Sequence, residues 1–165
     1  MAHAMSETRA LRAFWIAGAG FLAAAVAVAA LNALTPFERG WWLTAYLFLV
    51  GSASQLLLGS GQFLLAARRH TAEPPPKLLW TQLALWNIGA ATVAVADMTR
   101  VLPAVDAGSL ILIAALALFL AGVRHIGRAA HLRAAVLQRA YAALLIVLAG
   151  FVVLGTFLAG ALPGQ

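Results

Sequence analysis

The sequence predicts an all-α, polytopic membrane protein: a transmembrane five-helix bundle. Of its 165 residues, 64% are hydrophobic and only 10% are charged, whereas a soluble domain is about 45–50% apolar and about 25% charged. The mean hydropathy is +0.93. Five continuous apolar runs are each close to the roughly 20 helical residues that cross a hydrocarbon core. This composition excludes a soluble globular enzyme, a disordered chain and a fibrous repeat.

The first three helices follow from apolar runs and the breaks between them. Residues 13–34 are rich in alanine, and this run exceeds the 7–15 apolar residues of a signal peptide core, so we expect a retained helix. Residues 35–40 contain proline and glycine and end that helix. The second helix is predicted at 41–66. The loop at 68–77 contains three prolines, which cannot continue a helix, and the third helix is predicted at 78–96.

The last two helices complete a single transmembrane domain that takes in residues 1–165. Pro103 separates the third run from the fourth, and the fourth helix is predicted at 107–123. A basic stretch at 124–139 precedes the fifth helix, predicted at 140–162.

The positive charges predict the orientation of the helices. Cytoplasmic connections carry an excess of Lys and Arg. Five crossings place alternate connections on opposite sides of the membrane. The side away from the amino terminus then has two basic residues, Arg39 and Arg100. The other nine lie on the amino-terminal side: Arg9, Arg12, Arg68, Arg69, Lys77, Arg124, Arg128, Arg133 and Arg139. We therefore expect an inner-membrane protein with its amino terminus in the cytoplasm and its carboxyl terminus outside.

The net charge of +6 arises mainly from these short connections, so it indicates orientation and lipid contact and predicts no nucleic-acid partner. Arg124, Arg128 and Arg133 are candidate ligands for anionic headgroups of the cytoplasmic leaflet, worth about 1 kcal/mol per nearby cation. Docking of a partner subunit on the same stretch is the alternative.

A patch of polar side chains lies within the second and third predicted helices. Its members are Ser52, Gln55, Gln62, Gln82, Trp86 and Asn87. Amides buried in lipid seek partners across helix interfaces, so packing between helices is one interpretation. The other is a lining for a polar ligand, an ion or a cofactor edge. The indole N–H of Trp86 needs a partner when it is buried, and Gln55 and Asn87 are the candidates.

Asp97 is a carboxylate near the end of an otherwise apolar run, and Arg100 follows three positions later, on the same face of a helix. An ion pair between them near the outer end of the bundle is one interpretation. Because ionisable residues at membrane depth are functional candidates, a proton or cation site is the other.

The sequence predicts no catalytic residue, no metal site and no cofactor. It has no cysteine, and its four histidines (His3, His70, His125 and His131) lie outside the predicted spans. A bis-histidine haem needs imidazoles inside the membrane, so we expect no haem. Phosphate-binding loops, hydrolase nucleophile elbows and zinc-protease motifs do not occur.

The segment from Ala45 to Ala96 resembles the core of small haem–copper-oxidase-subunit-I-like membrane proteins, and it is similar to the nitric-oxide-response (NnrS-like) membrane proteins. The matching positions are Gly51, Gly59, Gln62, Pro74–Pro76, and Trp86 and Asn87 with Gly89. The match covers roughly 50 of the 165 residues. Tyr46 stands where that group has its first metal-site histidine. The resemblance therefore implies a scaffold without the haem and copper ligands, and it does not imply oxygen or nitric oxide reduction.

The function expected from these observations is that of a non-catalytic accessory, assembly or interaction subunit. Its expected partner is a second copy of the chain or a larger membrane complex of respiratory type. Small-residue faces of the second, fourth and fifth helices would form its interfaces; they include Ala117, Ala121 and Gly150. One alternative is a small transporter or channel lined by the polar patch. Another is an enzyme or sensor that binds haem, quinone or another hydrophobic ligand there.

Overall fold

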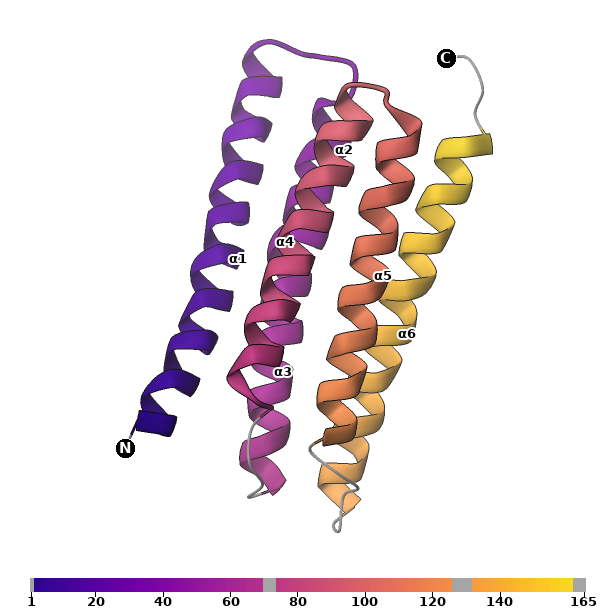
Figure 1. Cartoon of the computed structure of the whole chain (residues 1–165). Coiled ribbons are helices and arrows are strands. Elements are labelled where there is room, and N and C mark those ends of the chain that lie inside the picture. The colour runs from indigo at the N-terminus through magenta and orange to yellow at the C-terminus, as the bar shows by residue number, and fades with distance from the viewer. Residues whose placement is uncertain (1, 70–73, 126–131, 162–165) are drawn as a thin grey trace.

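Five helical rods lie side by side in the computed structural model, which describes residues 2–69, 74–125 and 132–161 (Figure 1). The second rod is composite, because a π-helix, η1, joins α2 to α3. The elements are α1 (Ala2–Leu34), α2 (Gly40–Tyr46), η1 (Leu47–Ala53), α3 (Ser54–Arg69), α4 (Pro76–Met98), α5 (Leu102–His125) and α6 (Leu132–Ala161). The predicted all-α bundle is confirmed.

Four stretches are long and apolar enough to cross a membrane: Leu11–Leu34, Gly40–Ala67, Pro76–Met98 and Leu102–Arg124. In α6, the apolar stretch found within the described residues is Ala135–Gly150, which is shorter than a full span. These lengths and compositions identify a multi-pass membrane protein.

Three helices begin well before the residue that hydropathy predicts. Helix α1 begins at Ala2, not at 13. Helix α5 begins at Leu102, not at 107. Pro103 lies in its first turn, where proline is tolerated because the N–H that it lacks would have no partner within the helix. Helix α6 begins at Leu132, not at 140. Hydropathy marks the part of a helix that lies in lipid, whereas the backbone remains helical through the polar residues beyond it.

The π-helix η1 interrupts the regular hydrogen bonding of the second rod, and π segments of this kind are often found at functional sites. Two side chains bind its backbone carbonyls. The Ser54 hydroxyl donates to the Leu49 carbonyl at 2.7 Å, and the Trp86 indole Nε1 donates to the Val50 carbonyl at 3.0 Å. The π-helix thus lies where α4 meets the second rod.

Glycines on the second rod receive aromatic side chains from α1. A Cβ at Gly51 would lie 2.3 Å from the Phe21 ring, and one at Gly59 would lie 2.7 Å from the Phe14 ring. Such distances are far below van der Waals contact, so only glycine allows α1 to pack this closely.

Helices α4 and α5 cross at another pair of glycines. A Cβ at Gly108 would lie 2.9 Å from the Val93 backbone nitrogen and 3.1 Å from the Gly89 carbonyl oxygen. The nearest atom would be the Val93 Cγ2 at 2.8 Å, but the other two are backbone atoms, so the main chains of the two helices approach closely at this point.

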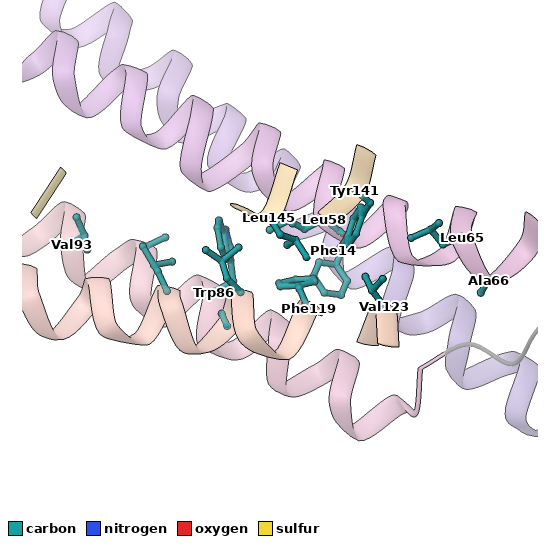
Figure 2. Close-up of a cluster of buried hydrophobic side chains, with 14 of the residues drawn as sticks. Phe14, Leu58, Leu65, Ala66, Trp86, Val93, Phe119, Val123, Tyr141 and Leu145 are labelled. Carbon is teal, nitrogen blue, oxygen red and sulfur yellow. The ribbon is translucent and has the colours of Figure 1, made fainter. Parts of the chain in front are cut away.

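The apolar core contains an aromatic cluster made by Phe14, Trp86 and Phe119 from α1, α4 and α5 (Figure 2). The Phe119 ring meets the Phe14 ring edge to face at 6.0 Å and the Trp86 ring at 6.2 Å. This geometry is favoured by the quadrupoles of aromatic rings. Trp86 belongs both to this cluster and to the predicted polar patch.

Candidate functional site

The structure brings the predicted polar patch into the interior of the bundle. Gln55, Gln62 and Gln82 are 0% exposed. Ser52 and Trp86 are also buried, and Asn87 is half-buried. The patch residues come from η1, α3 and α4.

Gln55 and Asn87 join α3 to α4 directly. The Asn87 amide Nδ2 donates to the Gln55 Oε1 at 2.9 Å and also to the Leu83 carbonyl of its own helix at 2.7 Å. Both protons of the Asn87 amide nitrogen are therefore used, one between α3 and α4 and the other within α4.

Gln62 and Gln82 reach from two helices to one turn of α5. The Gln82 Nε2 donates to the Leu118 carbonyl at 2.8 Å, and the Gln62 Nε2 lies 3.5 Å from the Phe119 carbonyl. Gly122 leaves room for the Gln62 amide, since a Cβ there would lie 3.0 Å from its Nε2. The sequence identified both glutamines but not their partners on α5.

Trp86 is hydrogen-bonded to the backbone instead of to a patch side chain. We expected Gln55 or Asn87 to accept its N–H, and that expectation is wrong, because the Val50 carbonyl in η1 accepts it. Since the π-helix is not visible in the hydrophobic pattern, this acceptor could not be found from the sequence.

Several patch atoms have no hydrogen-bond partner in the described part of the chain. They are Gln55 Nε2, Gln62 Oε1 and Gln82 Oε1. Each buried glutamine thus uses one end of its amide and leaves the other end unpaired. Most buried polar groups in proteins are paired, so these three atoms require an explanation.

Two tyrosines also lie at this interior. The Tyr141 hydroxyl of α6 donates to the Leu58 carbonyl at 2.8 Å, and its ring fills the space beside Gly61. Sequence reasoning missed Tyr141, although it is a polar aromatic residue at the start of a predicted span. The Tyr46 hydroxyl is buried and finds no hydrogen-bond partner within residues 2–69, 74–125 and 132–161. Tyr46 occupies the position where the resemblance places a metal-site histidine.

Asp97 pairs with Arg39, not with Arg100 as we expected. The Arg39 Nη1 lies 2.5 Å from the Asp97 Oδ1 and also donates to the Asp97 carbonyl at 3.1 Å. The hydrogen bond with Asp97 raises the pKa of the Arg39 guanidinium above its usual value. The second carboxylate oxygen of Asp97 is buried and has no hydrogen-bond partner among the residues that the structure describes.

Arg100 instead pairs with Glu38 at 2.6 Å. The expected pairing fails because α4 ends at Met98 and Arg100 has a φ of 58°, in the left-handed region. Arg100 has therefore left the helical face that it would share with Asp97. The two pairs together connect the α1–α2 link to the α4–α5 turn.

Among the predicted headgroup ligands, Arg124 is exposed at the end of α5. Arg128 and the side chain of Arg133 lie outside the described residues. Comparisons with protein-family models, with curated proteins and with solved structures find no match to this chain.

Proposed function

We propose that the chain is a non-catalytic inner-membrane bundle that works by association, as an accessory or assembly subunit. The observation that carries this proposal is the direct bond between the Asn87 and Gln55 amides at 2.9 Å. If the patch served passage of a solute, these amides would face an open path. Instead they bind each other, and the neighbouring glutamines bind the backbone of α5.

The aromatic cluster supports the same proposal. Phe119 is 0% exposed and packs between Phe14 and Trp86, at the level where Gln62 and Gln82 bind α5. A transport path along the patch would have to displace these rings.

The lipid-facing small residues offer surfaces for association. The glycines of the second rod are used inside the bundle by Phe14, Phe21 and Tyr141, which removes them from the expected interfaces. Ala117 and Ala121 of α5 are exposed, and Gly150 of α6 is exposed too, with nothing within 4 Å of a Cβ placed there. Small residues four apart allow close approach of a second helix in lipid.

The proposal is tested by the size of the complex that the chain forms in native membranes. We expect native mass spectrometry of membrane vesicles to find the chain bound to a second copy or to another membrane subunit, and we expect Ala117→Leu with Ala121→Leu to reduce the bound fraction. Ala91→Leu, on an exposed position of α4, is the matched control. A chain that remains monomeric in native vesicles, with or without these changes, would contradict the proposal.

A second candidate, a small transporter or ligand-binding protein, is favoured by the three unpaired amide atoms. Gln55→Leu separates the two functions. If the patch only packs helices, the variant loses stability and no uptake activity is present to lose; if it is a path, stability stays near that of the original chain and uptake is abolished.

A further inference from the structure

The π-helix η1 is held in its hydrogen-bonding register by a side chain from another helix. In a π-helix each N–H bonds the carbonyl five residues earlier, whereas in an α-helix it bonds the carbonyl four residues earlier. The N–H of Ser54, the first residue after η1, still bonds the Leu49 carbonyl. Because the spacing then returns to four in α3, one carbonyl is left without a backbone donor. The next carbonyl, that of Val50, is the one that accepts the Trp86 indole N–H at 3.0 Å.

Two contacts therefore favour the π form. If η1 became α-helical, the Ser54 N–H would bond the Val50 carbonyl and would compete with Trp86 for that acceptor. The Phe21 ring of α1 fills the space beside Gly51, where a Cβ would lie only 2.3 Å from it. A turn of the rod at this point would carry Gly51 away from the ring.

Tyr46, immediately before η1, favours the opposite change. Its hydroxyl is buried and has no hydrogen-bond partner among the described residues, while its ring stacks on Trp42 with 5.1 Å between the centroids. A buried unpaired hydroxyl is unfavourable by a free energy comparable to that of one hydrogen bond. The π register is thus stabilised at Trp86 and destabilised at Tyr46 by contributions of similar size, as a bistable element requires.

We propose that η1 is a conformational switch, through which the second rod changes between the π form and a continuous α-helix. A shift of register by one residue turns α2 by about 100° relative to α3. Arg39, immediately before α2, pairs with Asp97 of α4. The switch therefore connects the Trp86 contact inside the bundle to the ion pair at its end. The change of register requires no association with a partner.

Distances between pairs of spin labels test the switch, because the chain contains no cysteine of its own. Ala45→Cys in α2 with Ile88→Cys in α4 is the reporting pair, and Leu57→Cys in α3 with Ile88→Cys is the control pair; all three positions are exposed. A turn of about 100° moves a side chain on the surface of a helix about 10–12 Å wide by about 8 Å. The distance of the control pair stays constant. Both pairs are measured in lipid nanodiscs by double electron–electron resonance.

Trp86→Phe removes the donor that favours the π form. The displaced distance of the reporting pair is therefore expected to gain about fivefold in population relative to the original distance, as the loss of one hydrogen bond predicts. Adding Tyr46→Phe removes the unpaired hydroxyl that disfavours the π form, so the double variant is expected to reverse this gain.

Gly51→Ala acts on the same equilibrium from within η1, and it decides where Trp86→Phe does not fold. The added Cβ meets the Phe21 ring in the π form, so the displaced distance is again expected to gain population. Gly20→Ala is the matched control, since nothing lies within 4 Å of a Cβ there. The same single distance in the unmodified chain and in every variant that folds would overturn the proposal. A control pair that moves as far as the reporting pair would also overturn it, because the rod would then move as a whole.

Discussion

Single side chains decide how the rods of this bundle are held together, and most of them act on backbone atoms of a neighbouring helix. Trp86 binds the Val50 carbonyl, Gln82 binds the Leu118 carbonyl and Tyr141 binds the Leu58 carbonyl. The geometry of these contacts is well defined, because each acceptor carbonyl is held in place by its own helix. Their energies are modest, since hydrogen bonds between transmembrane helices average about 0.6 kcal/mol and reach about 1.7 kcal/mol.

Replacing Trp86 by Phe tests this contribution directly. The variant keeps an aromatic ring against Phe119 but removes the Nε1 donor from the Val50 carbonyl. We expect the free energy of unfolding in bicelles to fall by about 1 kcal/mol for the lost bond, and by more where the smaller ring leaves a void. Trp80→Phe, at an exposed position on the same helix, is the control and is expected to stay within about 0.5 kcal/mol of the original chain.

The residue scale is also where sequence reasoning was least complete. The six patch residues could be found because amides stand out in an apolar run, and the structure places them in one interior. Their acceptors are backbone carbonyls, which every residue has, so composition contains no signal for them. The Asp97–Arg100 expectation assumed that the helix continues, whereas the chain turns at Thr99 and exchanges the partners.

Whole helices approach one another where glycines remove the side chain. Helices α4 and α5 cross at Gly89 and Gly108, where backbone atoms of the opposite helix lie beside each glycine together with the side chains of Leu112 and Val93. A flexible side chain can rotate away from an added methyl group, but a backbone cannot. The predicted helices could be located because length and hydropathy are local properties, while this crossing depends on which helices become neighbours.

Gly108→Ala is therefore expected to separate α4 from α5. The added Cβ would lie 2.9 Å from the Val93 nitrogen, and overpacking of this kind typically costs about 1–3 kcal/mol of unfolding free energy. Gly150→Ala is the matched control, because nothing lies within 4 Å of a Cβ there, and the better helix propensity of alanine is expected to leave it unchanged or slightly more stable. Equal effects of the two substitutions would show that the α4–α5 crossing is looser than this geometry requires.

At the scale of the whole molecule, the charges divide between the two ends of the bundle. At the end formed by the α1–α2 link and the α4–α5 turn, Arg39 and Arg100 each pair with a carboxylate. Exposed cations gather at the opposite end, where α3 and α5 end and α6 begins (Figure 1). Among the described side chains, they are Arg12, Lys77, Arg124 and Arg139. The packing of the rods thus increases the charge asymmetry on which the predicted orientation depends.

This asymmetry predicts that the end with the two ion pairs faces outward. We expect Thr35→Cys, exposed in the α1–α2 link, to react with a membrane-impermeant thiol reagent applied to intact cells. Pro75→Cys, exposed at the opposite end just before α4, is expected to react only after the membrane is opened. Neither substitution alters a charged residue, so the difference reports orientation, with Lys and Arg retained in the cytoplasm by the cost of moving their charge through the bilayer. If Pro75→Cys alone were labelled in intact cells, the orientation would be the opposite of the predicted one. If both variants were labelled in intact cells, the two connections would lie on the same side of the membrane, which contradicts a bundle in which each rod crosses it.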